Sequence, residues 1–229
     1  MIPLKDDLPS ASKPVVTFAL IVLCTLVFCW QQTLDASAAR RAIDALGAIP
    51  AVLLGDARLP PDLEWLPRFL TVLTSMFLHG GWMHLLGNLL FLWVYGDNVE
   101  NSLGHLRFLF FYLFCGIVAV FAQSLANPDS AYPIIGASGA ISGVLGAYLW
   151  LFPRAKVLTL VLLPFFFTTL RIPAMLLLLL WFVVQLLSDF AVQGGGAGVA
   201  FRAHIAGFLT GMAAAAAFER FGRRLSTRS

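Results

Sequence analysis

Long apolar runs are the feature that most constrains this chain. Hydrophobic residues make up 59% of its 229 residues and charged residues only 12%, whereas soluble domains are about 45–50% apolar. Lipid offers no partners to unpaired backbone N–H and C=O groups, so only helices and closed barrels span a bilayer. Because the runs approach the ~20 apolar residues that a spanning helix needs, we expect an all-α, polytopic membrane protein.

Six spans are expected between the chain breakers. They lie near residues 15–34, 83–103, 106–126, 138–152, 173–190 and 202–219. The stretch 157–174 is also apolar, but Pro164, Arg171 and Pro173 favour an interfacial excursion over a seventh span. We expect a cytosolic tail at 1–13, one six-helix domain at 14–221 and a basic cytosolic tail at 222–229. The low-complexity pieces at 193–198 and 213–217 do not suggest another domain.

The loop charges predict an orientation. Ten Lys and Arg residues fall in the loops on the side of the N-terminus and five on the other side, which favours both termini in the cytosol. The first loop, from about 35 to 82, carries apolar residues at helical spacing in 38–49 and 68–78. We expect short amphipathic helices that lie in the outer interface and pack against the bundle.

Several classes of protein are disfavoured by what the chain lacks. Cys24, Cys29 and Cys115 all lie in apolar runs, without metal-site or disulfide spacing. The first apolar run has no small-residue cleavage site behind it, so no removed signal peptide is expected. Basic residues are not interleaved with aromatic residues in a patch, which argues against a nucleic-acid partner. A bacterial inner membrane is the expected location.

Polar side chains inside the expected spans are the candidates for function. A charged group at a helix centre costs about 2.5–3.5 kcal/mol on insertion scales, so ionisable and polar residues within a span are first considered for a functional role. The polar residues in question are His84, Asn88, Glu100, Ser138, Ser142, Gln185 and His204.

Ser138 and His204 are expected at similar depth. Each precedes a cytosolic arginine, Arg154 or Arg220, by 16 residues, or about 24 Å of helix against a hydrocarbon core of about 30 Å. Both would then lie below the outer surface at similar depth, and a base must lie within hydrogen-bond reach of the hydroxyl that it deprotonates. Taken singly, Ser138 is more often a serine bonded to its own helix, and His204 a satisfied core histidine; the combination of the two favours a catalytic pair.

Stripes of small residues allow the two helices to meet. Residues at four-residue spacing form one stripe on each helix, Gly139, Gly143 and Ala147 on the first and Ala203, Gly207 and Gly211 on the second. Small residues at this spacing let helix backbones approach closely in membranes. The stripes alone indicate packing and not catalysis.

His84 and Asn88 lie four residues apart and share a helix face. If this face turns towards Ser138, both side chains can donate hydrogen bonds to the oxyanion of a tetrahedral intermediate. The Ser138 amide, at a helix N-terminus, would be a third donor. The alternative is an ordinary interhelical hydrogen bond, worth about 0.6–2 kcal/mol.

Four motifs in this order resemble the rhomboid family of intramembrane serine proteases. HGGWMHLLGNLLF at 79–91 is similar to the family's His-x4-His-x3-Asn stretch, and GASGA at 136–140 to its Gly-x-Ser-Gly motif. AHIAGFLTG at 203–211 is similar to the Ala-His-x2-Gly-x3-Gly helix. Gly96, Glu100 and Gly104 match the Gly-x3-Glu-x3-Gly pattern.

The resemblance implies a role for each matching residue. Ser138 would be the nucleophile and His204 the general base and acid, with His84, Asn88 and the Ser138 amide as the oxyanion hole. Glu100 would tie helix ends together, and His79 would organise the outer loop. The glycines Gly136, Gly139, Gly143, Gly207 and Gly211 would support the site. The implied partners are membrane lipid and transmembrane substrates; no cofactor and no metal are implied.

Two positions depart from the family pattern. Many rhomboids carry a tyrosine four residues after the serine, where this chain has Ser142, so support for the His204 ring must come from elsewhere. Many have adjacent Trp-Arg in the first loop, whereas here Trp65 stands three residues before Arg68. Asp189 is the sole candidate for an acidic third member, and we expect a dyad without it. His105 is expected to be a surface residue.

Three rival functions remain from the residues. His79, His84 and His204 form a possible zinc set, although the His-Glu-x2-His spacing is absent. A catalytically silent relative that binds client helices is disfavoured by the presence of both Ser138 and His204. A channel or transporter is disfavoured because the chain lacks inverted Gly/Pro-broken repeats.

Overall fold

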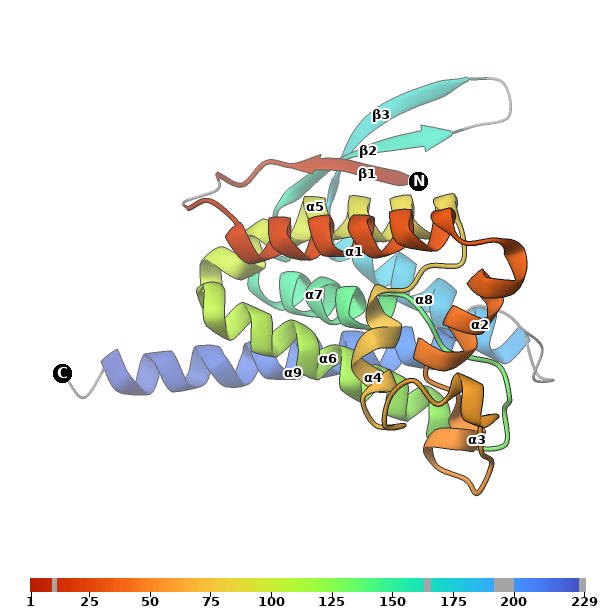
Figure 1. Cartoon of the computed structure of the whole chain (residues 1–229). Coiled ribbons are helices and arrows are strands. Elements are labelled where there is room, and N and C mark those ends of the chain that lie inside the picture. The colour runs from red at the N-terminus through yellow and green to blue at the C-terminus, as the bar shows by residue number, and fades with distance from the viewer. Residues whose placement is uncertain (10–11, 163–165, 192–199, 227–229) are drawn as a thin grey trace.

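The computed structural model describes residues 1–9, 12–162, 166–191 and 200–226, and most of them are helical (Figure 1). Each of the six longer helices begins within one residue of an expected span: α1 Val15–Thr33, α5 Trp82–Leu103, α6 His105–Ala126, α7 Ser138–Leu151, α8 Ala174–Ala191 and α9 Phe201–Ser226. The expected tail at 222–229 continues α9 as far as Ser226. Residues 227–229, Pro164 and the low-complexity piece at 193–198 lie outside the described part.

Four of these helices are long and apolar enough to cross a membrane: α1, α6, α8 and the Phe201–Arg220 part of α9. α5 qualifies only together with Thr71–Phe77, from which it is bent by 93°. α7 is apolar but has only 14 residues, about 21 Å. The described chain therefore provides four or five candidate spans rather than six. α7 lies in the middle of the bundle with every residue from Gly139 to Leu149 buried, so lipid does not set its length (Figure 1).

The expectation of an all-helical chain is wrong for two segments. β1 Ile2–Asp6, β2 Lys156–Leu162 and β3 Phe167–Pro173 form an antiparallel sheet in the order β1-β2-β3, on one side of the bundle (Figure 1). The described residues of the stretch 157–174 are thus two paired strands, apart from the first residue of α8, and not a seventh span. Val157 and Thr159 are fully buried while Lys156 is exposed, a period of two that belongs to a strand.

The first strand is tied to two helices through Asp6. Its Oδ2 accepts hydrogen bonds from Tyr148 Oη of α7 at 2.5 Å and from Asn98 Nδ2 of α5 at 2.7 Å. Burial raises the pKa of the Asp6 carboxyl. The segment expected as a plain cytosolic tail therefore anchors the ends of α5 and α7.

The first loop contains short helices in the segments expected to be amphipathic. They are α2 Ala36–Leu46, α4 Thr71–Thr74 and the 3-10 turn η2 Ser75–Phe77. Two further short elements, α3 Pro50–Leu53 and the 3-10 turn η1 Pro61–Leu63, lie outside those segments. Thr74 Oγ1 donates to Leu46 O at 2.6 Å, which holds α4 against α2. Ala48 pairs with Ile134 in an antiparallel bridge. The loop thus packs onto the backbone that leads into α7.

The aromatic and basic side chains of this loop bond within the loop itself. Trp65 Nε1 donates to Asp62 O at 3.0 Å, and Arg68 Nη1 donates to Val52 O at 3.3 Å. The Arg68 guanidinium also lies over the Phe69 ring. In place of an adjacent Trp-Arg pair, these two side chains secure separate turns of the loop.

α7 and α9 meet backbone to backbone. A Cβ atom on Gly207 would lie 2.1 Å from Gly139 O, and one on Gly211 would lie 1.9 Å from Gly143 O. The structure therefore brings the two stripes of small residues together. It adds Gly146, whose Cβ would lie 2.0 Å from Phe208 O, a contact that the stripe through Ala147 missed.

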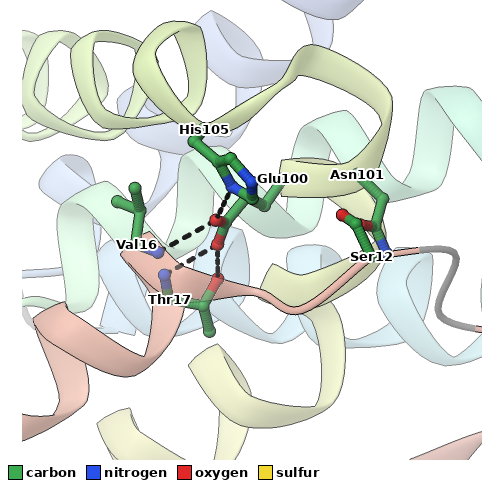
Figure 2. A network of polar contacts seen from close by, with 6 residues as sticks. All are labelled: Ser12, Val16, Thr17, Glu100, Asn101 and His105. Carbon is green, nitrogen blue, oxygen red and sulfur yellow. Dashed lines mark hydrogen bonds and ion pairs between the residues drawn. The ribbon is translucent and has the colours of Figure 1, made fainter.

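Glu100 caps the first turn of α1 from another helix. Its Oε1 accepts from Val16 N at 2.9 Å, and its Oε2 accepts from Thr17 N and Thr17 Oγ1, both at 2.7 Å (Figure 2). The residue that precedes α1, Pro14, offers no side-chain cap, so this buried carboxylate satisfies amides that a helix start leaves unpaired. His105 Nδ1 lies 2.6 Å from Glu100 Oε1. His105 is half exposed, as expected, but it also takes part in this network.

Packing of α9 on α7 predicts the effect of a single methyl group. We expect Gly211→Ala to lower the free energy of unfolding by about 1–3 kcal/mol or more, because its Cβ would overlap the Gly143 carbonyl. Gly87→Ala on α5 is the matched control, since no atom lies within 4 Å of its Cβ position, and it should be neutral or slightly stabilising. Unfolding in detergent micelles measures both. Equal stability of the two variants would contradict the close contact.

Removing the charge of Glu100 should also destabilise the bundle. In Glu100→Gln the amide NH2 can no longer accept the hydrogen bonds that the second carboxylate oxygen accepts, so we expect a loss of about 1–3 kcal/mol. Asp44→Asn breaks only the exposed Arg40–Asp44 pair and should cost at most about 0.5 kcal/mol. The thermal unfolding midpoints of the two variants test this difference.

Candidate active site

Ser138 stands at the first residue of α7, after a turn that requires glycine. Gly136 has φ +113°, a left-handed region that disfavours side chains, and its N–H donates to Ser75 O at 2.8 Å. This turn presents Ser138 at the N-terminal end of the helix, where amides have no partner within the helix and the helix dipole is positive. The hydroxyl thus sits where negative charge is favoured.

His204 of α9 lies beside this hydroxyl. Its Nε2 is 2.8 Å from Ser138 Oγ, and the imidazole is 9% exposed. The backbone contact between α7 and α9 explains the short distance. Gly139, which directly follows Ser138, meets Gly207, which lies about one turn after His204. The hydroxyl and the ring nitrogen are therefore within reach for proton transfer.

The other face of the imidazole is held by α8. His204 Nδ1 lies 2.8 Å from Gln185 Oε1, and the Trp181 ring centroid is 6.0 Å from that of His204. Phe201 adds an edge contact at 6.4 Å. Ser142 instead donates to Ser138 O, at 2.7 Å, so the support that a tyrosine at 142 would give comes here from Trp181 and Phe201.

Asp189 is engaged with another side chain. Its two oxygens accept from Arg202 Nε at 3.0 and 3.2 Å, and Arg202 Nη1 donates to Ala126 O. Gln185, rather than a carboxylate, is the group beside His204 Nδ1. The sequence marked Gln185 as a polar residue within a span, but it gave no partner for it.

His84 and Asn88 flank the turn that precedes Ser138. A Cβ on Gly136 would lie 2.6 Å from His84 Nε2 and 3.8 Å from Asn88 Nδ2. His84 Nδ1 accepts from Gly80 N at 3.3 Å, a bond that leaves the proton on Nε2. Asn88 Nδ2 donates to His84 O at 3.0 Å, and an amide NH2 has a second proton to give. Two side-chain donors thus lie next to the start of α7.

His79 is buried behind these donors. Its backbone N–H donates to Gln31 Oε1 at 3.0 Å, Gln31 Nε2 donates to its carbonyl at 3.2 Å, and its ring lies 5.2 Å from the His84 ring. This links the C-terminal end of α1 to the segment just before α5. Within the described residues, His, Cys, Asp and Glu do not gather in groups of three that could hold a metal ion.

A small apolar cavity opens next to Ser138. Its volume is about 20 Å³, and its walls include Met76, Gly116, Ala119, Gly139 and Ala203. A cavity of this size has room for about one water molecule or a methyl-sized group. Gly116 allows the wall to form, because a Cβ there would overlap Met76 Sδ.

Comparison with known proteins adds the family context. Residues 67–221 match the family model described as the Rhomboid domain. The chain is 37% identical over 138 residues to "Rhomboid protease GluP" of Bacillus subtilis, covering 60% of this chain and 25% of that protein. It is 30% identical over 134 residues to "Rhomboid protein 1, mitochondrial" of Saccharomyces cerevisiae, covering 52% of this chain and 39% of that protein. The chain thus spans less than half the length of these relatives.

Proposed function

Because the chain belongs to the rhomboid family, we propose that it is an intramembrane serine endopeptidase that cleaves transmembrane segments of other membrane proteins. The observation that carries this proposal is the 2.8 Å contact between His204 Nε2 and Ser138 Oγ. Its placement among membrane-spanning helices favours lipid-embedded substrates. Of the two relatives described above, the Bacillus subtilis protein is named a protease and the Saccharomyces cerevisiae protein is not. The experiments below therefore test activity directly.

The proposed reaction is acyl transfer. His204 Nε2 takes the proton from Ser138 Oγ, the oxygen attacks a peptide carbonyl, and His204 then protonates the leaving amine. The Ser138 amide, His84 Nε2 and Asn88 Nδ2 would donate to the oxyanion. Water hydrolyses the acyl-enzyme with His204 again as the base. No cofactor takes part in this scheme.

The substrate would enter from the lipid and be cleaved in an unwound segment. Helix-weakening residues near the cleaved bond would expose a backbone that is otherwise hydrogen-bonded. The cavity beside Ser138, about 20 Å³ in volume, would favour a small side chain next to that bond. The loop charges support both termini in the cytosol, with the first loop at the outer interface. The location we propose is a bacterial inner membrane.

The first prediction of this proposal concerns the reacting pair. In liposomes that contain a single-span substrate, Ser138→Ala and His204→Ala should each lower the cleavage rate by roughly 10⁴-fold or more. Ser102→Ala, which removes only a hydroxyl bonded to Asn98 O on α5, should cleave like the wild type. Equal cleavage by Ser138→Ala and the wild type would make Ser138 structural. Binding of substrate without cleavage by the wild type would favour the client-binding alternative.

The second prediction concerns the oxyanion donors. His84→Ala and Asn88→Ala should each lower kcat by about 10²–10³ with little change in KM, because an oxyanion donor acts mainly in the transition state. Steady-state kinetics on the same substrate measure both constants. An increase in KM with kcat unchanged would indicate instead that these residues bind the ground state.

A further inference from the structure

Gln185 is a buried polar side chain that contacts His204 and for which the proposed reaction has no use. It lies on α8, is 8% exposed, and places Oε1 2.8 Å from His204 Nδ1. Trp181, one turn earlier on the same face of α8, packs against the same ring. α8 thus presents two side chains to the imidazole, one polar and one aromatic.

We propose that Gln185 is a positioning residue that fixes the tautomer and orientation of His204, as a neutral third member of the site. This inference rests on the proposed function. Oε1 is only an acceptor, so the bond requires the proton on Nδ1. Nε2 then carries a lone pair and accepts the Ser138 hydroxyl at 2.8 Å. The other tautomer would place a proton on Nε2 and leave no base for Ser138.

A neutral amide suits this position better than a carboxylate. An ionised side chain inside an apolar bundle carries a large desolvation cost, whereas an amide orients the ring without adding charge. Asp189, four residues after Gln185 on α8, is already paired with Arg202. Gln185 therefore orients the ring without adding a charge that would stabilise its protonated form.

The charged and titratable surroundings of His204 define what a pH experiment reports. Ser138 faces the ring from α7 and His84 is the titratable group of α5 that interacts with it. The Asp189–Arg202 ion pair joins α8 and α9. Gln185 contributes no charge to this set, so replacing it by an acid adds one charge beside Nδ1 of the ring.

Two variants at position 185 test the inference through different readouts. Gln185→Leu removes the acceptor, and we expect kcat to fall by about tenfold or more with KM unchanged, since a histidine held in the wrong tautomer loses its function as a base. Gln185→Glu restores an acceptor and adds charge. It should recover kcat at high pH, while the acid limb of the pH–rate profile moves to higher pH because a carboxylate favours the protonated imidazole.

Gln123→Leu is the matched control. Gln123 Oε1 accepts from Ala203 N at 3.3 Å, so this glutamine tethers the start of α9 without touching the imidazole. The control should leave the acid limb of the pH–rate profile where it is in the wild type. If Gln185 had a merely structural role, the pH–rate profile of Gln185→Glu would be as unshifted as that of Gln123→Leu.

The outcomes separate this inference from the function on which it rests. If the wild type cleaves, and Gln185→Leu keeps the kcat of the wild type or Gln185→Glu leaves the acid limb unmoved, the role of Gln185 is overturned while the serine protease stands. If the wild type cleaves no substrate, or cleaves as well without the Ser138 hydroxyl, the proposed function fails and the role of Gln185 fails with it.

Discussion

The contact between the backbones of α7 and α9 is the constraint on which the rest of the structure depends. Gly207 and Gly211 lie so close to the carbonyls of Gly139 and Gly143 that even one methyl group does not fit. At this separation, a serine at the start of α7 and a histidine in the first turns of α9 reach each other at 2.8 Å. In lipid the hydrophobic effect contributes little to the pairing of helices, so close van der Waals packing is what holds Ser138 and His204 together.

Three polar side chains in this apolar bundle have partners on other segments of the chain. Glu100 of α5 caps α1, Gln185 of α8 meets His204 of α9, and Gln31 of α1 holds the backbone of His79. Each bond joins segments far apart in the sequence. The polar groups therefore contribute to the relative placement of the helices as well as to the surroundings of Ser138.

Sequence reasoning located the helices and the polar residues but not the partners of those residues. Apolar windows placed the starts of six helices to within one residue, and small-residue spacing predicted which faces of α7 and α9 meet. The three strands were not predicted. The stretch that holds β2 and β3 was assigned to an interfacial excursion because of its prolines and arginine, and its period of two was not used. β1 lies in the segment expected as a tail. Gln185 was seen as polar, but its target depends on the rotation of α8 about its axis, which hydropathy does not encode.

The central claim is that His204 activates Ser138 as a nucleophile, and the most direct measurement is the identity of the residue that a fluorophosphonate modifies. The protein in liposomes would be treated with the reagent, digested and analysed by mass spectrometry, with the wild type and His204→Ala in parallel. The account predicts modification of the wild type at Ser138 alone and almost none in His204→Ala. Modification at another serine, or equal modification of Ser138 in both proteins, would contradict it.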